Sequence, residues 1–142
     1  MEFISRSEKE TARFAACLAA TLRGGDILAL SGDLGAGKTT FVKGLAAALG
    51  VKRVVTSPTF TIMKEYETNC QKNGINHLVH IDAYRLESEA DVQSTGLTEM
   101  WERPDIVTAI EWPEKIRGLL PGRTRWLRFE TTDEAHRKIT AP

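Results

Sequence analysis

The stretch Ser31–Thr40, SGDLGAGKTT, places three glycines and a lysine between two apolar segments, and it decides the fold. From Gly32 to Thr39 it matches the pattern G-x-x-x-x-G-K-[ST] at every fixed position. Glycines let successive backbone N–H groups point into one concavity, which the positive N-terminal end of a following helix completes. In such a loop Lys38 reaches the β- and γ-phosphates of a nucleotide, and the Thr39 hydroxyl ligates Mg²⁺.

The segments on either side of this loop favour phosphate binding over a plain glycine-rich turn with an incidental lysine. Asp26–Leu30, DILAL, is too short for a helix and is typical of a buried strand in a parallel sheet. Lys38–Gly50 continues as a helix. The predicted nucleotide-binding loop comprises Gly32, Asp33, Leu34, Gly35, Ala36, Gly37, Lys38, Thr39 and Thr40.

The rest of the chain alternates between helix and strand patterns. Ser7 and Glu10 have capping-box spacing before a helix whose apolar face is Phe14, Leu18 and Leu22. Further strands are predicted within residues 54–67, 77–86, 105–112 and 122–132, with a short helix at 88–95 and a tail that extends the sheet or frays. The two segments around Asn73-Gly74 indicate an antiparallel hairpin. We therefore predict one α/β P-loop domain over residues 1–142, with a mixed, mostly parallel sheet flanked by helices.

Composition excludes several classes of function. Lys plus Arg and Asp plus Glu number 19 each among 142 residues, so no global field favours nucleic acid or an anionic membrane. No apolar run approaches the roughly 18 residues of a spanning helix, and the N-terminal segment lacks a signal-peptide core. Cys17, expected on the buried face of the first helix, and Cys70, in a polar loop, make no disulfide framework. We expect a soluble, cytoplasmic protein.

Two acids follow apolar segments and are candidates for the metal side of the site. Asp82 comes after LVHI, and Glu111 comes after IVTAI. Ligands of open α/β sheets bind at the carboxyl ends of the strands, and a P-loop enzyme needs carboxylates near its metal. Each acid taken alone would more often be a solvated strand end, but beside a P-loop we predict a functional role for both.

The segment TSPTF, residues 56–60, lies where nucleotide switches carry a threonine that meets Mg²⁺ and the γ-phosphate. Thr56, Ser57 and Thr59 all offer a hydroxyl, and Thr59 is our choice. A β-branched turn without any ligand contact is an equally good interpretation of this segment.

Other polar and aromatic residues carry less weight. His77 and His80 are three apart on a strand and so point to opposite faces, which argues against a shared metal. Trp112 suits either stacking near the site or a place in the core. Four arginines near the C-terminus are predicted to form a solvated edge or, less well supported, a weak patch for RNA or a partner: Arg117, Arg123, Arg125 and Arg128, of which Arg123 and Arg125 would share one strand face.

Together these motifs resemble one family. The ordered set GDLGAGKTTF, SPTF, HIDAYRL and IEWPEKI closely resembles the bacterial ATPase family of tRNA threonylcarbamoyladenosine biosynthesis, TsaE (formerly YjeE). The resemblance covers nearly the whole chain, and its motifs are specific in combination. It implies a small P-loop fold, Mg²⁺-dependent ATP binding, weak intrinsic hydrolysis, and work with the partner proteins TsaB and TsaD on tRNA. Contact with tRNA would then be indirect or through the weak arginine patch.

Carried onto this sequence, the resemblance implies roles for individual residues. Lys38 would contact phosphate, Thr39 and Glu111 would hold Mg²⁺, and Asp82 would support the metal or the attacking water. Thr59 would be the switch threonine. Thr11 and Arg137 occupy the regions where the family packs the base, and the resemblance extends to them as cofactor-binding residues.

Two further functions remain open from the residues alone. A small-molecule or nucleoside kinase would need an acceptor pocket and an arginine-containing lid, for which the sequence offers little room. A nucleotide-dependent binding switch with negligible catalysis would share the same loop. GTP specificity is disfavoured, because neither N-K-x-D nor T-K-x-D appears. A convincing internal arginine finger is also lacking, although Arg85 is a candidate, so we expect slow turnover that partners accelerate.

Overall fold

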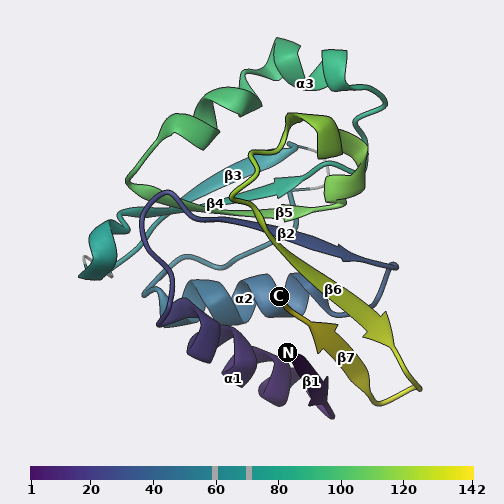
Figure 1. The fold of residues 1–142 in the computed structure, drawn as a ribbon. Helices are drawn as coiled ribbons and strands as arrows, with labels where there is room; N and C mark the ends of the chain where they lie inside the picture. Colours follow the sequence, from purple (N-terminus) through teal and green to yellow (C-terminus); the bar gives the residue numbers. More distant parts are fainter. Residues whose placement is uncertain (59–60, 70–71) are drawn as a thin grey trace.

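Within the described part of the chain, seven strands form one sheet in the order β1-β7-β6-β2-β5-β4-β3 (Figure 1). The structure is a computed structural model, and it describes residues 1–58, 61–69 and 72–142. The strands are β1 (Glu2–Ser5), β2 (Ile27–Gly32), β3 (Met63–Glu67), β4 (His77–Asp82), β5 (Ile106–Glu111), β6 (Arg125–Thr131) and β7 (Arg137–Thr140).

The centre of the sheet is parallel and both of its edges are antiparallel. β2 lies between β5 and β6 and runs parallel to both, with Leu28 opposite Ala109 on one side and Arg125 on the other. β4 continues the parallel part beside β5. The β3–β4, β6–β7 and β1–β7 pairs are antiparallel. The predicted α/β class with a mixed sheet, parallel in its core, is confirmed.

Helices cover both faces of the sheet, which explains why the central strands are apolar on both sides. In Figure 1, α1 (Glu8–Ala19) and α2 (Lys38–Ala48) lie on one face. The other face carries α3 (Glu89–Thr95) and the 3₁₀ segments η2 (Leu97–Glu102) and η3 (Pro113–Leu119). A further 3₁₀ turn, η1 (Lys72–Gly74), precedes β4.

The core consists of two clusters, one on each face of the sheet, because successive side chains of a strand point to opposite faces. Leu28 of β2 and Leu78 of β4 pack in the cluster that contains α1 and α2. Their neighbours Ile27 and Val79 pack in the other cluster.

Helix α1 begins as its capping pattern predicts. The Ser7 side chain accepts a hydrogen bond from the Glu10 backbone N–H at 3.1 Å, and Glu10 Oε2 accepts one from the Arg6 N–H at 2.7 Å. Phe14 and Leu18 are buried as expected. Cys17 is exposed rather than buried, so that expectation is wrong. Its position, three residues after Phe14, lies just outside the stripe that faces α2.

Several boundaries differ from the sequence prediction. β1 was not predicted, and it pairs with β7, so the C-terminal tail extends the sheet and brings the two termini together (Figure 1). In residues 54–67 only β3 forms a strand among the described positions. Arg123 precedes β6 and therefore shares no strand face with Arg125, contrary to expectation. Cys70 lies outside the described residues.

None of the helices in the described part of the chain is long and apolar enough to cross a membrane.

Gly44 sets how closely α1 and α2 approach, which gives a testable prediction. A Cβ at Gly44 would lie 2.7 Å from Ala12 Cα, a backbone atom that has no room to move aside. We expect Gly44→Ala to lower the free energy of unfolding by about 1–3 kcal/mol, as overpacked cores do. Urea denaturation measures this change.

The matched control for this prediction is Gly122→Ala, because a Cβ at Gly122 meets nothing within 4 Å. It should alter stability by no more than about 0.5 kcal/mol. Equal stability of the Gly44→Ala variant and the parent would contradict the close packing of the two helices.

Candidate functional site

The loop between β2 and α2 takes a backbone path that glycine makes possible. Gly32, Gly35 and Gly37 have φ of 144°, 80° and 100°. At Gly32 a Cβ would also lie 2.3 Å from the Phe129 carbonyl oxygen of β6. Because side chains disfavour these angles and this contact, the three glycines are required by the turn itself. α2 begins immediately after Gly37, so its first N–H groups face the loop.

Lys38, the first residue of α2, folds back toward the carboxyl end of the sheet. Its side chain is only 4% exposed, and Nζ donates a hydrogen bond to the Gly32 carbonyl at 2.5 Å. The same ammonium lies 3.7 Å from the ring centroid of Trp112, whose φ of 57° turns the chain directly after β5. A cation is thus held where the loop, α2 and the end of β5 meet.

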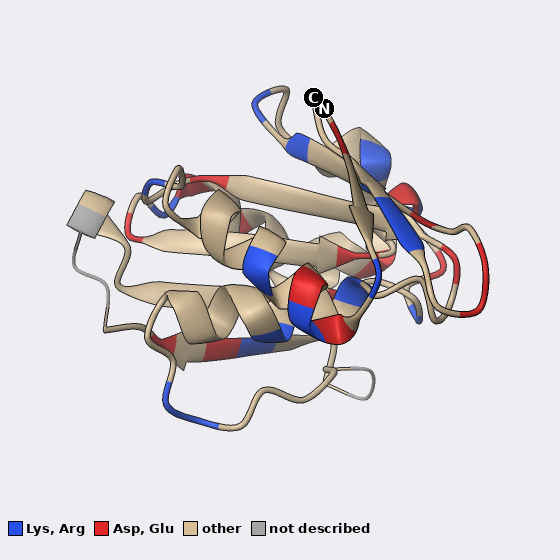
Figure 2. Cartoon of the chain, turned by 90° about the horizontal axis from the view of Figure 1, so that it is seen from below, with Lys and Arg blue, Asp and Glu red and all other residues tan. Residues whose placement is uncertain are grey.

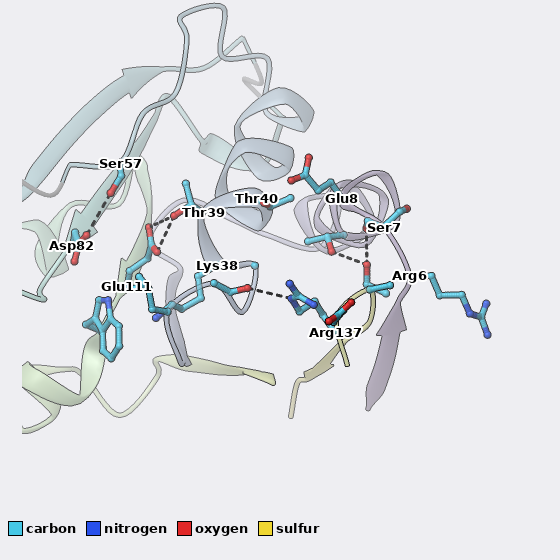
Figure 3. Close-up of a pocket in the computed structure, with 18 residues that line it drawn as sticks. Arg6, Ser7, Glu8, Lys38, Thr39, Thr40, Ser57, Asp82, Glu111 and Arg137 are labelled. Atoms are coloured by element: carbon cyan, nitrogen blue, oxygen red, sulfur yellow. Dashed lines mark hydrogen bonds between the residues drawn. The ribbon is translucent and has the colours of Figure 1, made fainter. Parts of the chain in front are cut away.

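A cavity of about 600 Å³ opens in front of this loop (Figure 3). Its lining combines α2 and loop residues, the ends of β4 and β5, and the junctions at β1–α1 and β6–β7. The residues are Ser5, Arg6, Ser7, Glu8, Thr11, Leu34, Gly35, Gly37, Lys38, Thr39, Thr40, Ser57, Asp82, Glu111, Trp112, Glu134, Ala135 and Arg137.

The two predicted acids meet at one end of the cavity. Asp82 ends β4 and Glu111 ends β5, directly opposite each other in the parallel register. Both are nearly buried, at 6% and 4% exposure. Thr39 Oγ1 lies 3.1 Å from Glu111 Oε1, so the loop helix is hydrogen-bonded to the neighbouring strand end (Figure 3). Asp82 accepts a hydrogen bond from Ser57 Oγ at 3.5 Å and from the Tyr84 N–H at 3.0 Å.

His80 is a site residue that the sequence analysis missed. It is fully buried, and its Nε2 lies 2.6 Å from Glu111 Oε2. Its sequence signal was its place two residues before Asp82, because residues two apart on a strand share a face. The sequence analysis considered His80 only as a possible metal partner of His77, so its shared face with Asp82 was overlooked.

The chemistry of these side chains fits Mg²⁺. Magnesium prefers oxygen ligands, keeps several waters, and is usually held by one or two protein groups together with substrate phosphates. Thr39 and Glu111 supply a hydroxyl and a carboxylate within hydrogen-bond distance of each other, and Asp82 stands beside them. Among the described residues there is no group of three or more His, Cys, Asp or Glu side chains that could hold a metal ion.

Thr11 and Arg137 line the same cavity, on α1 and β7. Arg137 Nε donates to the Gly35 carbonyl at 3.2 Å, which ties the last strand to the phosphate loop (Figure 3). Thr11 Oγ1 lies 2.7 Å from Ser5 Oγ of β1. Strands and helices from both ends of the chain therefore build this end of the cavity.

Three residues of the predicted nucleotide-binding loop do not line the 600 Å³ cavity. Gly32 contributes its carbonyl to Lys38, and Ala36 is buried under the loop. Asp33 faces a smaller neighbouring hollow of about 450 Å³, with Trp112 on its wall. Thr59, the predicted switch threonine, lies outside the described residues.

Burial governs the electrostatics of the lysine. Loss of hydration lowers the pKa of Lys38 below its ordinary value of 10.5, because burial disfavours the charged form. The carboxylates of Glu111, Glu114, Asp82 and Asp33 act in the opposite direction, with Glu111 the strongest of them. Burial remains the larger effect, so the ammonium is held at some cost to the folded protein.

Three of the arginines near the C-terminus contact other groups of the chain although they are exposed. Arg117 stacks on the Trp126 ring at 4.2 Å, Arg123 donates to the Trp101 carbonyl, and Arg128 pairs with Glu130 at 3.2 Å. Figure 2 shows positive and negative residues interspersed over the face that it presents.

Comparisons with known proteins find one family of similar chains. The model of a family described as "Threonylcarbamoyl adenosine biosynthesis protein TsaE" matches residues 5–139. The TsaE protein of Bacillus subtilis is 42% identical over 132 residues, which cover 93% of this chain and 78% of the relative. That of Treponema pallidum is 38% identical over 140 residues, covering 99% and 98%. A crystal structure of Bacillus subtilis YdiB matches with a TM-score of 0.79 at 35% identity, covering 99% of this chain and 83% of that one.

The buried lysine gives a prediction about pH. Between the lowered pKa of Lys38 in the folded protein and 10.5, the unfolded chain binds more protons than the folded one. The free energy of unfolding therefore rises with pH in this interval. We expect the stability of the parent, relative to Lys38→Met, to increase as the pH is raised toward 10.5 in urea denaturation.

Lys43→Met is the matched control, because Lys43 is exposed on the same helix. This variant removes one positive charge from a solvent-exposed position and so controls for the loss of a lysine as such. A parent that loses stability relative to Lys38→Met as pH rises would show that the ammonium is stabilised, not strained, by its site.

Proposed function

This chain belongs to the TsaE family of tRNA threonylcarbamoyladenosine biosynthesis, and from that premise we propose that it is a slow, Mg²⁺-dependent ATPase. The observation that supports this most strongly is the hydrogen bond of Thr39 to Glu111 in the cavity that also holds Lys38. A P-loop hydroxyl, a strand-end carboxylate and a lysine are the groups from which phosphoryl-transfer sites are built.

Each residue has a role in the proposed reaction. The loop N–H groups and Lys38 bind the phosphates, while Thr39 and Glu111 hold Mg²⁺. Held by these two residues, Mg²⁺ would supply positive charge against the negative charge that develops on the phosphates. Asp82, which accepts a hydrogen bond from the Tyr84 N–H, supports the metal or the attacking water from the neighbouring strand end.

The other end of the cavity suits the nucleoside. Thr11 presents a hydroxyl and Arg137 a guanidinium, and both line the same wall. Because Arg137 Nε already binds the Gly35 carbonyl, we propose that it couples the nucleoside end to the phosphate loop. ATP is the nucleotide of choice, since the sequence carries no guanine-reading motif.

Phosphoryl transfer depends on positioning and charge, and an arginine finger can raise its rate by about 10³- to 10⁵-fold. Because the sequence offers no convincing arginine finger, we propose that turnover by this chain alone is slow. We propose that TsaB and TsaD complete this site and that the chain meets tRNA through them. The balance of 19 basic and 19 acidic residues, with no global positive field, supports an indirect contact with tRNA over a direct one.

Nucleotide affinity tests the binding part of this proposal. Lys38→Ala removes charge-assisted hydrogen bonds to phosphate, which contribute about 1.5–3 kcal/mol. We expect the Kd for Mg-ATP, measured by calorimetry, to rise about 10- to 150-fold. Lys43→Ala removes another lysine side chain, on the exposed face of the same helix, and should leave the Kd unchanged. Equal affinities of the Lys38→Ala variant and the parent would contradict the assignment.

Single-turnover hydrolysis tests the catalytic part. ATP cleavage by the parent should be slow alone and faster when TsaB and TsaD are both added. Lys38→Ala should stay slow in their presence, which controls for a contaminating ATPase. A parent rate that the partners leave unchanged would overturn the proposed dependence on them.

A further inference from the structure

His80 carries a hydrogen bond to the metal-side carboxylate, yet the proposed reaction gives it no task. We propose that His80 is a positioning residue: its Nε2–H fixes the Glu111 carboxylate so that Glu111 and Thr39 together present oxygen ligands to Mg²⁺. This inference rests on the proposed function, and it adds a residue whose side chain is itself no metal ligand.

The placement of the two strands brings the groups together. β4 and β5 are parallel neighbours, with His80 opposite Ala109 and Asp82 opposite Glu111. His80, Asp82 and Glu111 lie at positions that share a face with Leu78, which packs in the cluster of α1 and α2. The imidazole therefore lies on the same side of the sheet as the start of α2.

The contact is short and excluded from water. His80 is 0% and Glu111 only 4% exposed, and Nε2 to Oε2 is 2.6 Å. Because an ionised carboxylate only accepts hydrogen bonds, Nε2 carries the proton and donates it. Charge-assisted bonds of this kind are roughly twice as strong as neutral ones.

The two oxygens of Glu111 are held from different strands and helices. Oε2 receives the His80 bond, while the Thr39 hydroxyl of α2 lies 3.1 Å from Oε1 and 3.3 Å from Oε2. A carboxylate held on both oxygens cannot turn freely about its side-chain bonds. Without His80, Glu111 would lose the partner of Oε2 on the buried side, and its orientation toward Thr39 would no longer be fixed.

Stability alone does not account for a histidine at this position. Its other ring nitrogen, Nδ1, is buried without a hydrogen-bond partner among the described residues. Buried polar atoms without partners cost free energy, so an apolar side chain would suit a purely structural place in the sheet better. Only a side chain with a donor at the Nε2 position can make the hydrogen bond to Glu111. Partners of this kind orient metal ligands, and their loss typically lowers metal affinity or activity 10- to 100-fold.

The test measures metal affinity separately from nucleotide affinity. With protein in excess over the ATP analogue AMP-PNP, the Kd of Mn²⁺ is read from the electron paramagnetic resonance signal of the free ion. His80→Leu should raise this Kd about 10- to 100-fold. The affinity for AMP-PNP without metal, in EDTA, should stay near that of the parent, because Lys38 and the loop are unchanged.

Two further variants separate positioning from folding. His80→Gln keeps an N–H donor near the Nε2 position and should restore Mn²⁺ affinity. His77→Leu is the matched control on the same strand, since His77 is partly exposed and lies near Glu65 at the other end of β4. It should bind Mn²⁺ as the parent does.

Each outcome decides the inference. Parent-like Mn²⁺ affinity of His80→Leu would overturn it, and so would a His80→Gln variant as defective as His80→Leu. In both cases a parent that binds AMP-PNP and Mn²⁺ leaves the proposed function standing. A parent that binds neither would overturn the proposed function itself, and the role of His80 with it.

Discussion

The hydrogen bond between Thr39 and Glu111 is the interaction on which the arrangement of the site depends. It joins the first turn of α2 to the end of β5 across 72 residues of chain. It can form because β2, which leads into the loop, is the direct parallel neighbour of β5. The order of the strands therefore brings a hydroxyl and a carboxylate, two oxygen ligands suited to magnesium, to one place.

Buried polar side chains concentrate around this interaction. Of the seven buried polar or charged residues in the described part of the chain, five line the cavity: Ser5, Thr11, Lys38, Asp82 and Glu111. His80 contacts Glu111, and Thr108 is the remaining one. Burying such groups costs free energy unless they are paired, and the lowered pKa of Lys38 records part of that cost. Stability alone does not favour gathering buried polar side chains in this way. A site that binds charged ligands requires them, and here they lie around the carboxyl ends of β4 and β5.

The sequence was sufficient to predict the parts of the structure that local chemistry determines. Local patterns predicted the helices, the central strands and the end of the sheet where the site residues meet. These patterns are the glycine spacing of the loop, the cap at Ser7, and the apolar segments ahead of Asp82 and Glu111. Membership of the TsaE family, predicted from the combined motifs, is confirmed. The roles of the individual site residues stay predictions.

Features that depend on distant pairing were harder to predict. β1 is only four residues long, and it is stable as a strand because β7 lies beside it. The contact of His80 with Glu111 joins two strands through their register, which no local pattern reveals. Cys17 was misplaced because the helical stripe around it mixes small and apolar residues, so the periodicity left its face ambiguous.

The central claim is that this cavity binds a magnesium-bound nucleoside triphosphate. Calorimetric titration of the parent protein under reducing conditions tests this claim most directly. We predict saturable heat with Mg-ATP at one nucleotide per chain and a weaker response with Mg-GTP. Absence of heat with every nucleoside triphosphate would contradict the account.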